Sequence, residues 1–185
     1  MKILSFFPAH SSKYKTFFMK IIITIFMLMT SFTAMAQDGK ANTVKNTFNR
    51  KTTVSTSINA DASIVWALLT NASDFSRWNS TIVSIEGEIQ KGEKIKLKST
   101  LDPGRTFKLK IKEVVPEQKL VWGDALGKRT YSLEKQGDST LFTMAEKIGG
   151  LMFPLFAKKI PPFDESFEQF ASDLKKEAET ISKSK

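Results

Sequence analysis

Three side chains of this sequence have the chemistry for acid–base catalysis: Glu146, Asp124 and Tyr131. Each lies in a stretch that alternates like a β-strand and has apolar neighbours, so each could face a dry pocket. Such a pocket raises the pKa of a carboxyl group towards neutrality, which suits a general acid or base. The alternative is that all three face solvent or satisfy local hydrogen bonds. We expect none of them to be catalytic and keep them only as candidates.

Other catalytic systems are excluded by the residues that the sequence lacks. It contains no Cys, and its single His is His10. His10 falls in an amino-terminal segment that we expect to be removed, so the rest of the chain can hold no Ser–His or Cys–His nucleophile and no His/Cys zinc site. No glycine-rich phosphate loop or dinucleotide motif occurs either. We therefore expect no metal and no cofactor.

The amino-terminal segment has the three parts of a secretory signal peptide. Lysines precede an uncharged apolar run of 13 residues, Ile21 to Thr33, and the small-x-small site Ala34-Met35-Ala36 follows it. The run is shorter than the about 20 residues that a membrane-spanning helix needs. We expect residues 1–36 to be cleaved and the protein to be exported to the periplasm or the extracellular space, with an uncleaved membrane anchor as the alternative. Residues 1–18 are a candidate upstream extension, because Met19 could itself begin the signal.

Removal of residues 1–36 lowers the net charge from +9 to +5, since four basic and no acidic residues are lost. This charge is too small to indicate nucleic-acid binding without a clustered patch, and we expect none. Residues 37–51 are polar and without periodicity, which favours a flexible leader. Residues 52–184 remain for one domain. The sequence does not define the oligomeric state, and we expect a monomer.

Phenylalanine dominates the aromatic residues, with 15 Phe against two Tyr. Phe needs no hydrogen-bond partner when it is buried, so such an interior suits either a dry core or an apolar ligand. Both roles remain open for each residue. The candidate ligand-binding residues are Met152, Phe153, Phe156, Phe163, Phe167 and Phe170 towards the carboxyl end, and Phe75, Trp78, Phe107, Leu109, Trp122 and Met144 before them.

Lysine alternates with apolar residues in two consecutive runs, which are separated by the turn signal Asp102-Pro103-Gly104. The runs predict a β-hairpin with one apolar and one basic face. Glu86 and Glu88 on the neighbouring strand could offset the charge; alternatively, the basic face could dock to an anionic membrane surface. The lysines are Lys94, Lys96, Lys98, Lys108, Lys110 and Lys112.

The remaining pattern predicts an α+β fold. A strand at residues 52–59 is followed by helices at residues 62–70 and around residues 75–78, and a period of two then continues from residue 81 to 147. Apolar residues recur at helical spacing from Phe163 to Ile181. A sheet curved around one long helix encloses more volume than side chains readily fill, and such cavities bind apolar ligands.

Four motifs occur along the chain: Ala62-Ser63-Ile64-Val65-Trp66 through Leu69, Phe75-Ser76-Arg77-Trp78-Asn79, Val115-Pro116 through Leu120-Val121-Trp122, and Glu146 to Phe156. In this order they resemble the START-like helix-grip superfamily, also called SRPBCC, and within it the polyketide cyclase/dehydrase and lipid-transport group. The resemblance covers residues 52–182. It implies a helix-grip fold, with a curved seven-stranded antiparallel sheet wrapped on a long C-terminal helix and two short helices after the first strand.

The resemblance implies a ligand class rather than a reaction. Members include lipid and sterol carriers, hydrophobic-hormone binders, aromatase/cyclases and co-chaperone domains, and the fold alone cannot choose among them. We expect non-catalytic binding or transport of a hydrophobic small molecule or lipid between the sheet and the C-terminal helix. The alternative is a cyclase- or dehydratase-type enzyme that uses Glu146 or Asp124. Export disfavours a protein-interaction module of the co-chaperone kind.

The stretch Gly149 to Phe156, GGLMFPLF, is expected at the entrance of the cavity. The two glycines would end the last strand, and Pro154 is tolerated in the first turn of a helix. The apolar side chains would then begin the long helix, or insert into a membrane if they are exposed. Pro161-Pro162 departs from the family pattern and should break or kink any helix that starts here.

Overall fold

The structure of the protein, a computed structural model, describes residues 38–184. The predicted signal peptide at residues 1–36, His10 included, lies outside the described residues. Within residues 38–184, no helix is long and apolar enough to cross a membrane.

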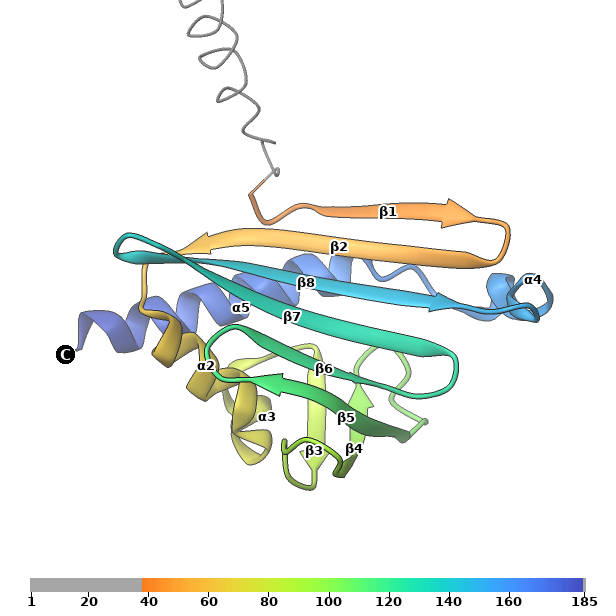
Figure 1. The fold of residues 1–185 in the computed structure, drawn as a ribbon, viewed down its shortest axis with the longest axis horizontal. Coiled ribbons are helices and arrows are strands. Elements are labelled where there is room, and N and C mark those ends of the chain that lie inside the picture. Colours follow the sequence, from red (N-terminus) through yellow and green to blue (C-terminus); the bar gives the residue numbers. More distant parts are fainter. Residues whose placement is uncertain (1–37, 185) are drawn as a thin grey trace, which may run out of the picture. The chain divides into compact units, whose positions relative to one another are not determined.

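One antiparallel sheet of eight strands dominates the fold (Figure 1). Its strand order is β1-β2-β8-β7-β6-β5-β4-β3, so every pair except β2–β8 is adjacent in the chain as well. The strands are β1 (Ala41–Asn46), β2 (Asn49–Ile58), β3 (Ile82–Glu86), β4 (Lys94–Ser99), β5 (Phe107–Val115), β6 (Lys119–Gly123), β7 (Gly127–Gln136) and β8 (Ser139–Gly149).

The described residues contain four α-helices: α2 (Ala62–Thr70), α3 (Phe75–Trp78), α4 (Phe153–Phe156) and α5 (Asp164–Lys183). The long helix α5 lies against one face of the sheet, while α2 and α3 lie at one end and α4 at the other (Figure 1). The predicted helix at residues 62–70 is confirmed, and the Asp61 side chain caps it by accepting a hydrogen bond from Ser63 N at 2.9 Å.

The sequence expectation of seven strands is wrong, because a further strand, β1, precedes them. The predicted flexible leader is wrong for residues 41–51, which form β1 and the start of β2. β1 is an edge strand with mostly exposed side chains, so it carries little hydrophobic signal. Helix α5 holds it: Glu168 Oε1 accepts a hydrogen bond from Ala41 N at 3.0 Å, and Thr43 Oγ1 donates one to Asp164 Oδ1 at 2.8 Å.

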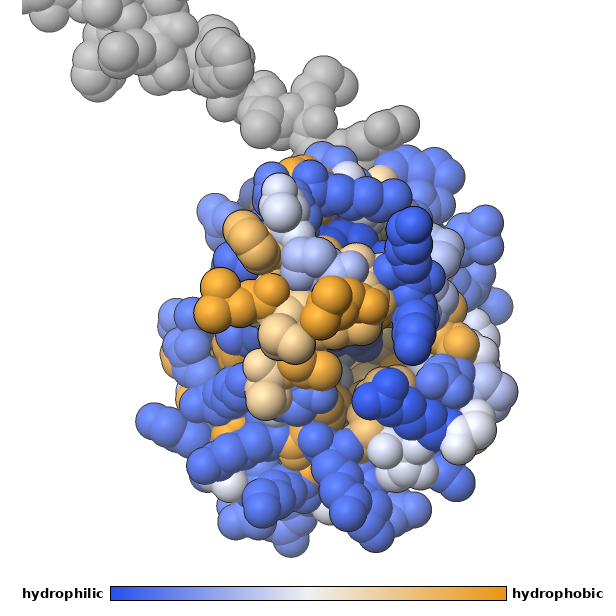
Figure 2. All heavy atoms as spheres, turned by 90° about the vertical axis from the view of Figure 1, so that its right-hand side faces the viewer, coloured by the Kyte–Doolittle hydropathy of each residue, from blue (hydrophilic) through white to orange (hydrophobic). Residues whose placement is uncertain are grey.

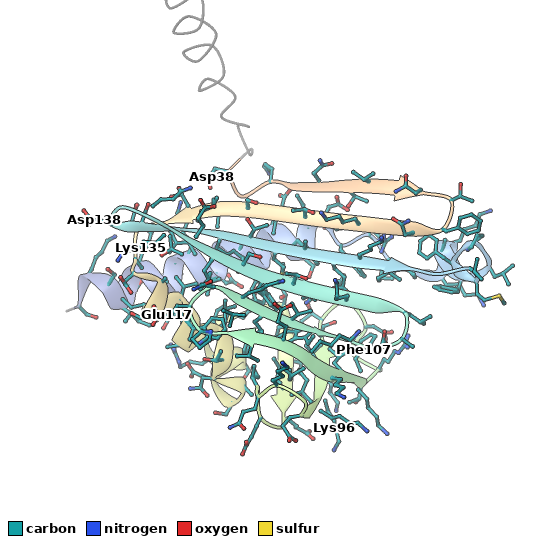
Figure 3. All side chains as sticks on the ribbon, in the orientation of Figure 1. Asp38, Lys96, Phe107, Glu117, Lys135 and Asp138 are labelled. Carbon is teal, nitrogen blue, oxygen red and sulfur yellow. The ribbon has the colours of Figure 1, made fainter. Side chains whose placement is uncertain are left out.

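The predicted lysine hairpin is confirmed as β4 and β5. Ile95 lies opposite Leu109 and Leu97 opposite Phe107, and lysines occupy the alternate positions on the other, exposed face. Lys96 projects outward from the sheet (Figure 3). Only part of the expected charge offset is present among the described residues, since Lys96 pairs with Glu86 at 3.2 Å while Glu88 forms no ion pair.

The interior at the α2–α3 end is a packed aromatic cluster. The apolar stripe of α5 contributes Phe170, whose ring lies 5.7 Å from Trp78 and 6.4 Å from Phe75. Tyr131 and Trp122 of the sheet complete the cluster with edge-to-face contact at 5.0 Å. Aromatic side chains therefore pack closely in this part of the space between sheet and helix.

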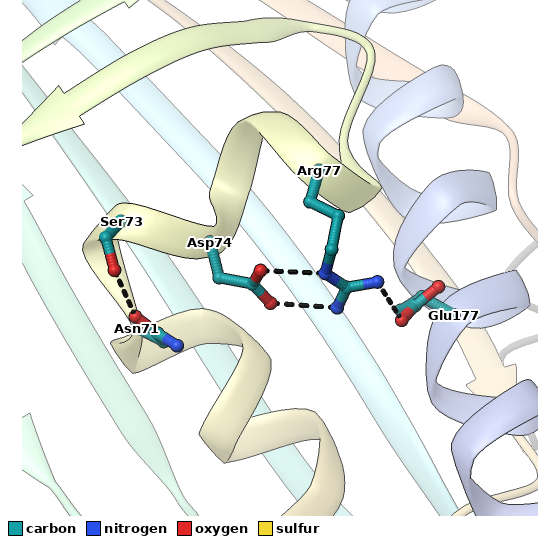
Figure 4. A network of polar contacts seen from close by, with 5 residues as sticks. All are labelled: Asn71, Ser73, Asp74, Arg77 and Glu177. Carbon is teal, nitrogen blue, oxygen red and sulfur yellow. Dashed lines mark hydrogen bonds and ion pairs between the residues drawn. The ribbon is translucent and has the colours of Figure 1, made fainter.

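A polar network fastens α3 to α5 (Figure 4). The Arg77 guanidinium donates to both carboxylate oxygens of Asp74, at 2.7 and 2.8 Å, and to Glu177 Oε1 on α5 at 2.6 Å. The hydrogen bond from Arg77 lowers the pKa of Asp74 below its ordinary value. The short helical segment around α3 is thereby joined to α5, which is distant in sequence, on the outer surface beside the aromatic cluster.

The predicted helix break at Pro161-Pro162 is confirmed, but the expectation that GGLMFPLF begins the long helix is wrong. Residues 153–156 form the separate helix α4 with Pro154 in its first turn, and α5 starts only at Asp164. The reason is visible at Arg50, which donates hydrogen bonds to the carbonyl oxygens of Ile160 and Pro161, at 3.3 and 2.7 Å. Its guanidinium also lies 4.6 Å from the centre of the Phe163 ring.

Candidate ligand pocket

A pocket of about 230 Å³ lies beside the aromatic cluster on the side towards α4, and Trp122 borders both. Strands β3 to β8 and the segment between α4 and α5 supply most of its lining, and Phe107, labelled in Figure 3, marks its place in the sheet. The lining is apolar for the most part, with Leu97, Leu109, Ile148 and Ile160 among the contributing side chains. The segment at residues 160–163, which Arg50 holds, therefore closes one side of the pocket.

An ion pair between Arg129 and Glu146 lies in this mainly apolar lining, to which charged residues such as Arg105, Asp124 and Lys159 also belong. The two residues face each other across β7 and β8, and Glu146 Oε2 accepts hydrogen bonds from Arg129 Nη2 at 2.5 Å and Nε at 2.6 Å. Both side chains are largely shielded, with exposed fractions of 17% and 16%. Burial opposes the charge of Arg129, but Glu146 and Tyr131 outweigh that effect, so the pKa of Arg129 lies above its ordinary value.

The ion pair leaves polar groups free to meet a ligand. Within residues 38–184, Glu146 Oε1 accepts no hydrogen bond and Arg129 Nη1 donates none. The Arg129 guanidinium is held from behind by the Phe167 ring, at 5.1 Å from its centre. A polar group of a bound molecule could therefore engage the pair without breaking it.

The carboxylate of Asp124 stabilises the turn between β6 and β7. Its Oδ1 accepts hydrogen bonds from Leu126 N and Gly127 N, at 2.8 and 2.7 Å, which shapes the turn between β6 and β7. Asp124 lines the mouth of the pocket and is exposed to solvent. A turn-forming, solvated carboxylate is poorly suited to general acid or base work.

Tyr131 lies outside the pocket lining and is buried in the aromatic cluster. Its hydroxyl has no hydrogen-bond partner in the described structure. Burial raises the pKa of Tyr131 to about 12, although the nearby Arg129 charge works against the rise. A phenol with this pKa remains protonated at neutral pH and is no general base there.

The aromatic and apolar candidates from the sequence divide into three groups. Five of them line the pocket: Phe107, Leu109, Trp122, Phe156 and Phe163. Six others are buried but do not line the pocket: Phe75, Trp78, Met144, Phe153, Phe167 and Phe170. Met152 does neither and is exposed.

Sequence reasoning missed Arg129, which is as well shielded in the lining as Glu146. Its strand alternates polar and apolar residues, and an arginine in such a pattern is ordinarily assigned to the solvent face. The available signal was its spacing from Tyr131 and Leu133, which places all three on one face of β7. Arg105, whose guanidinium lies 4.6 Å from the Phe107 ring centre at the mouth, was missed because it belongs to a turn.

Comparison with known proteins supports the fold and identifies the family. Residues 59–179 match the family described as Activator of Hsp90 ATPase homolog 1-like protein. No curated protein gives a significant match to the whole sequence.

Solved structures share the fold at low sequence identity. A conserved protein of unknown function from Enterococcus faecalis has a TM-score of 0.57 at 17% identity, with 77% of this chain and 78% of that chain covered. A START superfamily protein from Mycobacterium smegmatis has a TM-score of 0.53 at 15% identity, with 71% and 98% covered. The di-domain ARO/CYC protein BexL of the BE-7585A biosynthetic pathway has a TM-score of 0.58 at 13% identity, with 73% of this chain but only 52% of BexL covered.

These identities establish the fold alone, whereas the family match spans more than half of the sequence. The eight-stranded antiparallel sheet with its long C-terminal helix is consistent with a helix-grip architecture. The chain belongs to the Activator of Hsp90 ATPase homolog 1-like protein family, within the START-like helix-grip superfamily.

Proposed function

We propose that this protein binds a small, mainly apolar molecule with at least one polar group, and that it acts as an exported carrier rather than as an enzyme. The observation that carries the proposal is the apolar pocket with the Arg129–Glu146 ion pair in its lining. A pocket lined by hydrophobic side chains with a few placed polar groups is the usual form of a small-molecule site.

The size of the pocket favours a small ligand over a whole lipid. Its volume of about 230 Å³ lies between an engineered cavity of roughly 150 Å³ that accepts benzene and the roughly 300 Å³ at which drug-sized sites begin. A compound of one or two rings fits this range. A phospholipid would have to leave much of its length outside.

The polar part of the ligand follows from the ion pair. Arg129 is placed to donate to a carbonyl, carboxylate or hydroxyl oxygen, and Glu146 Oε1 is placed to accept from a hydroxyl or amine. Burying these groups against a purely apolar ligand would leave them without hydrogen bonds, which is unfavourable. The carrier therefore prefers an amphipathic molecule to a hydrocarbon.

A cyclase- or dehydratase-type reaction remains the second candidate, because Glu146 is a carboxylate inside the pocket. Two N–H groups of Arg129 hold one of its oxygens, so moving a proton through Glu146 would disturb the ion pair. Asp124 is held by its hydrogen bonds in the turn, so it is not available as a second acid–base group beside Glu146. For these reasons we favour binding without catalysis.

Export belongs to the proposal on the strength of the sequence alone. The lysines, the apolar run at residues 21–33 and the site ending at Ala36 have the order of a cleavable signal. An exported carrier would work in the periplasm or outside the cell.

A pocket-filling substitution tests the binding proposal. In Leu109→Trp a larger side chain enters the pocket, whereas Lys108→Trp places the same side chain on the exposed face of the same strand. The probe is naphthalene-1-sulfonate, a fluorescent two-ring system with an anionic group suited to Arg129. We expect Leu109→Trp to weaken probe binding at least tenfold in a fluorescence titration, and Lys108→Trp to leave it within about twofold. Equal binding by both variants would refute the pocket as the site.

A further inference from the structure

Exposed apolar side chains are concentrated at the pocket end of the molecule. We define the apolar tip as Phe48, Leu126, Leu151, Met152 and Leu155. Their exposed fractions are 52%, 49%, 87%, 62% and 74%, and they make up five of the eight exposed large hydrophobic residues in the described part of the chain. Figure 2 looks onto this end and shows apolar side chains gathered on a face that is otherwise polar. Scattered single exposures are ordinary, but a cluster of this kind marks an interaction site.

The tip is a fixed surface built from three loops. Gly149 N donates to Leu126 O at 3.0 Å and Gly150 N donates to Phe48 O at 2.9 Å, so the three loops are joined by backbone hydrogen bonds. Inside the third loop Phe153 is buried and packs on Phe156 at 5.6 Å. The stretch GGLMFPLF thus anchors one side chain in the protein and turns Leu151, Met152 and Leu155 outward.

A row of lysines starts beside the tip and crosses the outer face of the sheet. We define the basic row as Lys51, Lys147, Lys128, Lys110 and Lys94. Lys51 on β2 lies opposite Lys147 on β8, which lies opposite Lys128 on β7. Gly123 on β6 separates Lys128 from Lys110 on β5, and Lys110 lies opposite Lys94 on β4. Like charges directly opposite each other on paired strands destabilise the fold. The stability of the sheet therefore does not account for this row of lysines.

The charge of this surface is not neutralised within residues 38–184. None of the five lysines of the basic row forms an ion pair there, in contrast to Lys96 with Glu86. Lys158 and Lys159 add two exposed charges directly after α4, and they too form no ion pair. Residues 147–163 contain no acidic residue at all.

We propose that the apolar tip and the basic row together bind the surface of an anionic lipid bilayer. Outward apolar side chains of different shapes flanked by charge of a single sign suit a bilayer, in which hydrocarbon lies beneath anionic headgroups. A protein partner would require a matching arrangement of acidic and apolar groups, whereas a bilayer accepts any such cluster. Leu126 belongs to both the tip and the pocket lining, so docking brings the mouth of the pocket to the membrane. Use of this docking for ligand exchange rests on the proposed function; the docking itself does not.

Vesicle binding tests the inference. The described residues 38–184 form one compact unit, so the chain starting at Gln37 is used and the apolar run at residues 21–33 cannot contribute. We expect this chain to cosediment with phosphatidylcholine vesicles that contain a quarter phosphatidylserine, and to bind pure phosphatidylcholine vesicles at least tenfold more weakly. Binding to the anionic vesicles should fall as salt is raised.

Two pairs of matched variants locate the contact. Leu151→Asp/Leu155→Asp should lower the partition coefficient at least tenfold, while Val83→Asp, an exposed apolar position on β3, should leave it unchanged. Lys51→Gln/Lys147→Gln should lower it about fivefold per lysine. Lys176→Gln/Lys183→Gln removes the same charge from α5 and should have less than a twofold effect.

Three outcomes would overturn the inference: no binding of the wild type to anionic vesicles, equal losses in a test variant and its control, or a tip variant that changes only self-association. The tip and lysine variants should still bind the fluorescent probe in the pocket. If they do so while vesicle binding of the wild type is absent, membrane docking fails and the proposed carrier function stands.

Discussion

The Arg129–Glu146 pair is the residue-scale feature that separates this interior from a plain hydrophobic core. Breaking one partner leaves a largely buried charge without compensation. We therefore expect Arg129→Met to lower the free energy of unfolding by about 3 kcal/mol. The double variant Arg129→Met/Glu146→Leu replaces both charges with apolar groups and should lie within about 1 kcal/mol of the wild type. Urea unfolding of the three proteins measures the difference.

An equal decrease in the free energy of unfolding in the single and double variants would contradict this expectation. It would show that the decrease comes from packing around Arg129 and not from the unpaired charge of Glu146. The pair was not predictable from the sequence at this scale. Glu146 was identified as a carboxylate on an apolar strand, but its partner lies 17 residues away and meets it only through the register of β7 and β8.

At the scale of elements, acidic side chains fasten helices and strands at their ends. The pKa of Asp74 is lowered by its hydrogen bond from Arg77, and that of Glu168 by hydrogen bonds from Ala41 N and Lys40. A carboxylate whose pKa is lower when folded stabilises the protein above the ordinary value, 3.8 for Asp, and loses that contribution as the pH falls through the lowered value.

We accordingly expect the free energy of unfolding to be nearly constant from about pH 7 to pH 5 and to fall below about pH 4. Asp74→Asn should reduce stability at neutral pH and make the acid decline shallower, since the group that must be protonated is gone. Asp138→Asn, in the β7–β8 turn without an ion pair in the described structure, is the control. The account of α3 would be wrong if the two variants gave the same pH profile in thermal or urea unfolding.

Helices and strands with a clear hydrophobic periodicity in the sequence were predicted, and those without it were missed. Helix α2 and the lysine hairpin were predicted from periodicity, because each buries one face and exposes the other. β1 was missed because it is held by Glu168 and Asp164 of α5, through contacts more than 120 residues apart in sequence. The break before α5 was predicted from Pro161-Pro162, whereas the role of Arg50 in holding that segment needed the structure.

At the scale of the whole molecule, one sheet and one long helix enclose two different interiors. Aromatic side chains pack closely near α2 and α3, and a pocket lies beside them beneath the apolar tip. The Phe-rich composition predicted both possibilities without separating them, because Phe75 and Phe107 look alike in the sequence. The structure distinguishes them, because Phe75 packs in the cluster near α2 and α3 whereas Phe107 lies beside the pocket.

Native mass spectrometry of the protein purified from its own host shows whether the pocket carries a ligand in the exported protein. We expect a chain that starts at Gln37 and carries one small organic molecule, lighter than a membrane phospholipid. We also expect that Leu109→Trp, made in the same host, loses that molecule while Lys108→Trp keeps it. A wild-type chain that is bare under conditions that preserve non-covalent complexes, or an adduct retained equally by Leu109→Trp, would contradict the binding proposal.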